Sequence, residues 1–277
     1  MSDSPASGSA AIDGMGTARA RCVLAPNPSP MTLDGTNTWI IAEPGSPQAV
    51  VIDPGPDDEP HLRRVHGQVT SAGQTVAQIL LTHSHPDHAE GAASFAALTG
   101  APVRAADPAY RQGSEGLAPG TTTTASGCEI RVVPTPGHTA DSVCLHLPAD
   151  HALLTGDTVL GRGTTVIAND GNLTDYLASL DRLRALTDQA GLTALLPGHG
   201  PMLSDPDSTL DYYISHRHER LAEVQAALDA GDRTMDEIVA RIYHDVDRAL
   251  WPYAAFSVRA ALRYLADQGA LPPGVKQ

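Results

Sequence analysis

The chain has 277 residues, which suffice for one large α/β domain with a small appendage or for two ordinary domains. Its formal charge of -14 would repel a polyanion unless basic residues gather locally, so the composition disfavours a nucleic-acid substrate. The sequence shows no apolar run long enough to cross a membrane, no secretory leader and no paired cysteine motif, so we expect a soluble, cytoplasmic protein without membrane contact.

Residues 1–18 are mainly Ser, Ala and Gly, and we expect a disordered tail there because they offer little apolar surface. From residue 19 onward, short apolar runs bounded by Pro, Gly and Asp are typical of strands. The predicted strands are Thr38–Ala42, Ala49–Ile52, Gln78–Thr82, Ile130–Val133, Val143–Leu147, Ala152–Leu154 and Ala194–Leu196. Apolar residues at helical spacing predict helices over His61–Ser71, His88–Leu98 and Asp175–Leu186. This mixture predicts an α/β (α+β) fold for residues 19–205.

Residues 206–277 have a different pattern of predicted secondary structure, since the predicted strands stop and three helices follow. They span Thr209–Ala230, Thr234–His244 and Ala254–Gln268. Thr234 and Glu237 form a capping-box pattern at the start of the second helix. The three helices resemble a small winged-helix-like domain. Such domains bind DNA in other proteins, but basic residues here are matched by acidic ones, which favours a packing or pocket-closing role.

The sharpest feature is the segment Thr-His-Ser-His-Pro-Asp-His, which directly follows an apolar, strand-like run. It supplies four metal-type ligands, which are His83, His85, Asp87 and His88. In an extended chain His83 and His85 project to the same side, so they can share one metal. Pro86 keeps His85 extended and lets a helix begin, which directs the last two ligands toward a second metal. The spacing therefore suggests two metal sites.

Three further candidate ligands, His138, Asp157 and His199, each lie in a glycine-containing turn after an apolar run. Polar residues at strand ends are where α/β folds gather their active sites. Each of these positions is a weak signal alone. Their occurrence together, after the four-ligand segment, makes a shared site the better interpretation.

In this order the ligands resemble those of the metallo-β-lactamase superfamily, over about residues 20–205, and Asp53 matches that family's early strand-end Asp. The resemblance implies an αββα sandwich with two metals at one edge of two packed sheets. It implies that one metal is held by His83, His85 and His138, that the other is held by Asp87, His88 and His199, and that Asp157 bridges them. Asp53 would orient the ligand loop without touching metal; a turn-forming role before Pro54 is the alternative.

The implied chemistry is hydrolysis by a metal-bridging hydroxide, because two divalent cations about 3.5–4 Å apart lower the pKa of a bound water to around neutrality. Asp87 and Asp157 are the predicted catalytic residues, with Asp87 orienting the water and accepting its proton. The cofactors are expected to be two divalent metal ions. Zinc suits the His and Asp ligands, and iron or manganese are alternatives.

An Asp at position 157 is typical of the glyoxalase II, phosphodiesterase and nuclease branches of the superfamily. Residues 27–39 and 213–220 also resemble the β-lactamase-like protein 2 group, which includes a single-stranded RNA endonuclease and is similar to fungal thioesterases. His216, Arg217 and Arg220 share the first C-terminal helix, and we predict that they hold an anionic substrate group. The alternative is a helix surface on which the arginines pair with nearby Glu residues.

We therefore expect a dinuclear-metal hydrolase that acts on an ester, thioester or phosphodiester, with a small-molecule or carrier-bound acyl substrate favoured by the acidic charge. A single-stranded RNA endonuclease, with RNA as the partner, is the second hypothesis. A non-catalytic, metal-containing regulator that binds through its C-terminal domain is the third, and the complete ligand set argues against it. The sequence leaves the oligomeric state open.

Overall fold

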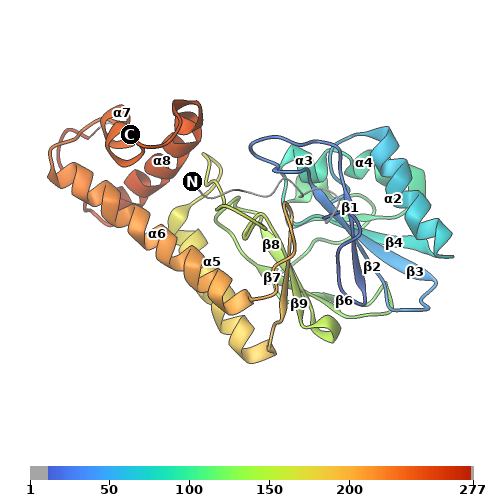
Figure 1. The fold of residues 1–277 in the computed structure, drawn as a ribbon. Coiled ribbons are helices and arrows are strands. Elements are labelled where there is room, and N and C mark those ends of the chain that lie inside the picture. The colour runs from blue at the N-terminus through green and yellow to red at the C-terminus, as the bar shows by residue number, and fades with distance from the viewer. Residues whose placement is uncertain (1–11, 276–277) are drawn as a thin grey trace.

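Two five-stranded sheets form the centre of the computed structural model, which describes residues 12–275 (Figure 1). The first sheet has the strand order β1-β2-β3-β4-β5, and the second has the order β10-β9-β8-β7-β6. The first comprises β1 (Ala20–Leu24), β2 (Asn37–Ile41), β3 (Gln48–Ile52), β4 (Thr75–Leu80) and β5 (Val103–Arg104). The second comprises β6 (Thr122–Thr123), β7 (Ile130–Pro134), β8 (Val143–Leu147), β9 (Ala152–Gly156) and β10 (Ala194–Pro197). The seven predicted strands are present.

Strand alternation explains why the sheets pack face to face. On β3, Val50 and Ile52 lie in the core between the sheets, whereas Ala49 and Val51 lie in a second core under the helices. Successive side chains of a strand point to opposite faces, so a strand apolar on both faces is buried on both. On β9, Leu153 likewise packs against helices on the outer face of the second sheet. The predicted αββα sandwich is confirmed.

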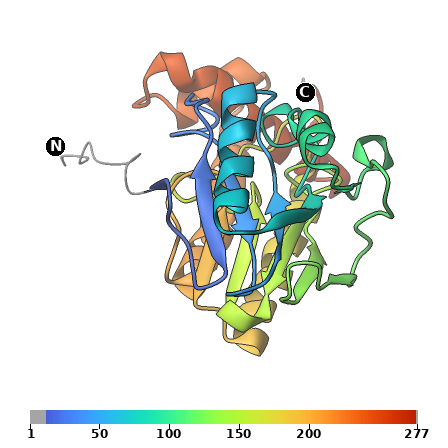
Figure 2. The same ribbon diagram turned by 90° about the vertical axis from the view of Figure 1, so that its right-hand side faces the viewer.

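Helices cover the outer face of each sheet. The first sheet is covered by α2 (Glu59–Ser71), α3 (Pro86–Ala89) and α4 (Ala92–Thr99), with α2 in front of the sheet in Figure 2. The second is covered by α5 (Leu173–Ala190). Short 3-10 turns occur at η1 (Pro108–Tyr110), η2 (Pro148–Asp150) and η3 (Arg248–Leu250).

The predicted single helix His88–Leu98 is wrong, because the chain breaks between α3 and α4. Gly91 lies at the break, and its N–H donates to the Gly55 carbonyl at 2.9 Å. A Cβ at Gly91 would lie 2.7 Å from the Pro56 carbonyl oxygen, closer than real Cβ contacts allow. This close backbone approach joins the start of α4 to the loop after β3.

Three helices form the C-terminal part, namely α6 (Pro206–Asp229), α7 (Met235–Ile242) and α8 (Trp251–Asp267). The predicted capping box of α7 is confirmed, with Thr234 and Glu237 each bonding to the other's backbone. Apolar residues of α5, α6 and α8 belong to one continuous core with the outer face of the second sheet. The C-terminal helices are therefore packed onto the sandwich, at the upper left of Figure 1.

The predicted tail is wrong for residues 12–18, and residues 1–11 lie outside the described residues. Ile12 is 1% exposed and packs in the core between the sheets, with Met15 against the same core. The Cys22 N–H also donates to the Met15 carbonyl at 2.8 Å. Two apolar side chains in a polar segment thus suffice to order it. Within residues 12–275, no helix has both the length and the apolar character needed to cross a bilayer.

His61 on α2 gives a pH-dependent contribution to stability. Its side chain is 2% exposed, and its Nε2–H donates to Thr38 Oγ1 at 3.0 Å, because the Thr38 hydroxyl donates to the Asp53 carbonyl. Burial, followed by the charge of Arg64, lowers the pKa of His61 to about 4. The folded state therefore excludes a proton that the unfolded state binds below about pH 6.5.

We expect the stability contributed by neutral His61 to be complete above pH 6.5 and to be lost as pH falls toward 4. Between pH 7.5 and 5 the wild-type chain should lose about 2 kcal/mol more unfolding free energy than His61→Gln. Urea denaturation at the two pH values measures the difference. His66→Gln, a partly exposed histidine on the same helix, is the control, and equal losses in all three proteins would contradict the prediction.

Candidate metal centre

The candidate ligands converge because each follows a strand that ends at the same edge of the two sheets. In the second sheet β9 and β10 are parallel with Gly156 opposite Pro197, so Asp157 and His199 emerge side by side. In the first sheet Ile52 of β3 pairs with Leu80 of parallel β4, which brings Asp53 next to Thr82. The two sheets are also tied here, since Thr82 O accepts from Val143 N–H at 2.8 Å.

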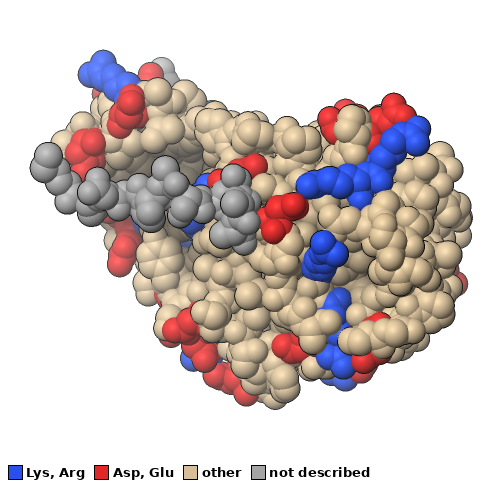
Figure 3. Space-filling model, turned by 45° about the vertical axis from the view of Figure 1, so that its right-hand side comes forward, with Lys and Arg blue, Asp and Glu red and all other residues tan. Residues whose placement is uncertain are grey.

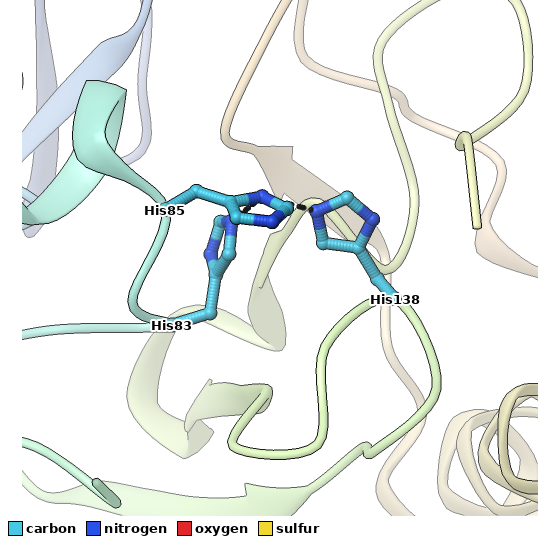
Figure 4. A group of neighbouring side chains, drawn as sticks. All are labelled: His83, His85 and His138. Carbon is cyan, nitrogen blue, oxygen red and sulfur yellow. Dashed lines mark hydrogen bonds between the residues drawn. The ribbon is translucent and has the colours of Figure 1, made fainter. Parts of the chain in front are cut away.

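His83, His85 and His138 form the first group of potential ligands, and their rings point toward one another (Figure 4). The Nδ1 atom of His85 lies 3.2 Å from His83 Nε2 and 2.9 Å from His138 Nε2. His83 and His138 are buried, whereas the His85 side chain is 27% exposed. The group therefore has one face open to solvent.

Asp87, His88 and His199 form the second group. The Nε2 atoms of the two histidines lie 3.2 Å apart, and Asp87 Oδ2 lies 3.1 Å from His199 Nε2. The two histidines are buried, and the Asp87 side chain is 27% exposed. Asp87 is therefore the member of this group that incoming water or substrate can reach.

Asp157 lies between the two groups. Its Oδ2 atom is 3.3 Å from His199 Nε2 and 3.7 Å from His138 Nε2. Its Oδ1 atom is buried, 3.4 Å from His88 Nε2, and makes no well-formed hydrogen bond among residues 12–275. A buried carboxylate oxygen without a hydrogen bond is costly unless a cation lies beside it.

The outer nitrogen of every histidine in the cluster is already hydrogen-bonded. Each outer N–H has an oxygen acceptor: His83 Nδ1 with Thr82 Oγ1, His85 Nε2 with Asp170, His88 Nδ1 with Asp53, His138 Nδ1 with Val166 O and His199 Nδ1 with Gly35 O. When the outer nitrogen carries the proton, the inner nitrogen carries the lone pair. Five lone pairs then face inward, as histidines that bind metal require.

The spacing of the inner atoms fits a metal centre. Tetrahedral coordination at the usual zinc–nitrogen distance of about 2.0–2.1 Å places ligand nitrogens roughly 3.3 Å apart. The observed separations within the two groups are 2.9–3.2 Å. The donor set and its spacing are thus suited to two divalent cations, with Asp157 able to reach both.

Without a bound cation, the carboxylates of the cluster favour protonation of two of its histidines. Burial disfavours charge, but the Asp157 and Asp87 carboxylates raise the pKa of His88 well above its usual value, and Asp157 raises the pKa of His199 to about 9. Burial lowers the pKa of His83 well below its usual value. Although burial opposes ionisation, His199 and His88 hold the pKa of Asp157 well below its usual range. A metal entering the second group must displace these protons.

Asp53 contacts the ligand segment from outside the cluster. Its carboxylate accepts hydrogen bonds from Thr82 N–H at 2.7 Å, from the Thr82 hydroxyl at 2.6 Å and from His88 Nδ1 at 2.9 Å. Its backbone φ is +48°, a left-handed conformation that Asp tolerates better than most residues. This turn at the end of β3 directs the carboxylate toward the ligand loop.

The three predicted substrate residues lie in two different environments. Arg217 is 3% exposed, donates to the Thr165 carbonyl and stacks on the Tyr176 ring, 5.0 Å from its centroid. It therefore supports the loop after Asp157 from beneath and is not placed to meet a substrate. His216 and Arg220 line a cavity of about 210 Å³ between this loop and the C-terminal helices.

The sequence did not identify several residues that contact the ligands. Thr165 Oγ1 donates to the Asp157 carbonyl at 2.7 Å, and Val166 and Asp170 accept from the two ligand histidines named above. These residues lie in a loop without a motif. Their role depends on the path of the loop, which no local pattern encodes.

Comparison with known proteins agrees with this geometry. Residues 31–199 match the Metallo-beta-lactamase superfamily, and residues 234–270 match the Beta-lactamase associated winged helix domain. The chain belongs to the metallo-beta-lactamase superfamily. The winged helix match covers α7 and α8, so the predicted winged-helix-like C-terminal domain is confirmed.

Several known proteins are similar to most of this chain. A Beta-lactamase-like protein 2 homolog of Drosophila melanogaster is 32% identical over 267 residues, which cover 90% of this chain and 88% of the homolog. The Lactamase-like protein adaB of Aspergillus niger is 30% identical, with 83% of this chain and 76% of that protein covered. The crystal structure of a metallo-beta-lactamase family protein from Thermus thermophilus superposes with a TM-score of 0.75 at 22% identity, covering 91% of this chain and 94% of that one.

Replacing Asp53 with Asn should weaken metal binding without removing a ligand. Asn also tolerates the left-handed backbone, but it loses the charge that orients His88, so zinc affinity should fall roughly 10–100-fold. Competition with a chromophoric chelator measures this affinity. Asp57→Asn, an exposed neighbour in the same loop, should bind zinc as the wild-type chain does. Wild-type affinity in Asp53→Asn would show that the carboxylate does not support the site.

Proposed function

We propose that the protein is a dinuclear-metal hydrolase that acts on an ester, thioester or phosphodiester, with a small or carrier-bound acyl substrate favoured. The single observation that supports this proposal best is the Asp157 carboxylate, which lies within 3.3–3.7 Å of histidines from both ligand groups. A carboxylate in that position can bridge two cations. A single-metal site would not need it.

Two bound divalent cations, most suitably zinc, would supply Lewis acidity and a water whose pKa is near neutrality. The remaining roles, which are to orient the water, accept its proton and exclude bulk solvent, fall to the protein's own residues. Asp87 lies at the solvent-exposed side of the cluster, so it can orient the attacking water and accept its proton. The Thr36 hydroxyl lies 3.5 Å from Asp87 Oδ2 and can hold that carboxylate in place. The buried histidines exclude water from the other side.

The cavity beside the loop after Asp157 favours an acyl substrate. Its lining is mainly apolar and aromatic, and includes Val166, Tyr243, Val246, Leu250 and Tyr253. Arg220 in its wall pairs with Glu223 at 2.7 Å and lies 5.1 Å from the Tyr243 ring centroid, so a neighbouring carboxylate already offsets its charge. Such a cavity suits an apolar group that carries at most one negative charge.

Cleavage of single-stranded RNA is the second candidate. It is favoured by similarity over 90% of the chain to Beta-lactamase-like protein 2 homologs, a group that includes a single-stranded RNA endonuclease. The charge of -14 weighs against it. On the face shown in Figure 3, the basic side chains form a broken row of separate groups, with acidic side chains beside several of them. A non-catalytic regulator is disfavoured, because binding alone does not need the whole ligand set.

Elemental analysis and assays on one sample test the proposal. The purified wild-type chain should hold two metals and cleave an acyl thioester, whereas Asp157→Ala should lose roughly 100-fold or more of that activity because the carboxylate between the groups is gone. A phosphodiester and a single-stranded RNA are assayed in parallel. Activity on RNA alone, lost in Asp157→Ala, would select the endonuclease. Less than one metal per chain with no activity would refute the hydrolase.

Arg220→Ala should raise KM about 10-fold for an acyl substrate that carries a carboxylate and leave kcat nearly unchanged, since the side chain would bind ground state and transition state alike. Steady-state kinetics on that substrate measure the split. Arg63→Ala is the matched control, because Arg63 also pairs with a Glu on its own helix but lies on α2. Unchanged KM in Arg220→Ala would leave the arginine as a surface cation paired with Glu223.

A further inference from the structure

His85 is held differently from the other four histidines of the cluster. Its ligand atom is Nδ1, which faces His83 and His138, so its Nε2 points away from the cluster. That nitrogen lies 2.9 Å from Asp170 Oδ2. His85 is also the most exposed of the five, so without Asp170 its outer N–H would face water and its ring would be free to turn.

The segment that carries Asp170 is fastened to the turn that carries His138. The Asn172 N–H donates to the Gly137 carbonyl at 2.9 Å, and His138 Nδ1 donates to the Val166 carbonyl at 2.8 Å. A Cβ at Gly171 would lie 2.5 Å from both the Gly137 and His138 carbonyl oxygens, so the two backbones are in direct contact. Asp170 and His138 therefore keep a fixed relation to each other.

The C-terminal helices hold the other side of the same segment. Asn169, which precedes Asp170, lies 3.4 Å from Arg259 and 3.5 Å from Arg263, both on α8. Arg217 of α6 donates to the Thr165 carbonyl. Residues 165–170 thus lie between the C-terminal helices on one side and the ligand histidines on the other.

We propose that Asp170 is a positioning residue for the metal ligand His85, and that Arg259 and Arg263 hold the segment that carries it. The carboxylate accepts the His85 Nε2–H, which fixes the ring orientation and the tautomer with the lone pair on Nδ1. The C-terminal winged-helix domain thereby contributes to the geometry of the metal centre. This inference rests on the proposed metal-dependent function.

Zinc binding tests the role of Asp170. Asp170→Ala should bind zinc about 10-fold more weakly in competition with a chromophoric chelator, and the visible spectrum of its cobalt-substituted form should differ from that of the wild-type chain. Asp170→Asn keeps an oxygen acceptor and should restore much of the affinity. Asp181→Ala removes an exposed Asp on α5 and is the matched control. The metal-free variants should unfold at the same temperature as the control.

The outcomes separate this inference from the proposed function. If the wild-type chain binds two zinc ions and Asp170→Ala matches it in affinity and cobalt spectrum, the positioning role is wrong and the hydrolase stands. If the wild-type chain binds neither zinc nor iron nor manganese, the hydrolase itself fails. Arg259→Ala with Arg263→Ala should weaken zinc binding less than Asp170→Ala, and should add nothing to it in the triple variant. Additive losses would show that α8 does not act through Asp170.

Discussion

The buried Asp157 carboxylate, surrounded by imidazole nitrogens, is the constraint on which this site depends. A carboxylate removed from water is strongly destabilising unless cations or hydrogen bonds compensate it. In the metal-free chain the compensation comes from protons held by His88 and His199. Two divalent cations would provide it more fully and would release those protons. The surrounding fold can be understood as a means of holding these opposed charges in place.

Parallel strand pairs in both sheets provide that support. Neighbouring parallel strands end at the same edge, which explains why Asp157 emerges beside His199 in one sheet and Asp53 beside Thr82 in the other. The left-handed backbone of Asp53 adds a local strain that only tight packing can maintain. Below it, Thr38 and the buried His61 hold the Asp53 carbonyl. The support of the metal centre therefore reaches from the sheet edge down to α2.

The sequence predicts features that depend on local period and spacing. The two-residue interval between His83 and His85 places both on one side of an extended chain, and the structure brings their inner nitrogens within 3.2 Å. Short apolar runs bounded by Pro, Gly and Asp predict strands, and the seven predicted strands are present. The order of His138, Asp157 and His199 becomes informative only together with the four-ligand segment. These signals need no knowledge of the loops between strands.

Features that depend on the path of a loop or on distant contacts were not predictable. Arg217 has the helical spacing of a surface cation, but the loop after Asp157 covers it, so it is buried. Ile12 lies in a polar segment, and only the nearby edge of the first sheet reveals why it is ordered. The break before α4 depends on the backbone contact between Gly91 and Gly55. In each case the deciding partner is remote in sequence or without a motif.

The C-terminal helices form one packed unit with the second sheet. They complete the core that covers the second sheet, so their removal would expose apolar residues of α5 to water. Two residues of α6 contact the loop that follows Asp157. The Tyr213 hydroxyl accepts from the Leu160 N–H, and Arg217 donates to the Thr165 carbonyl. The C-terminal helices therefore support the loop whose residues contact the ligands Asp157 and His138.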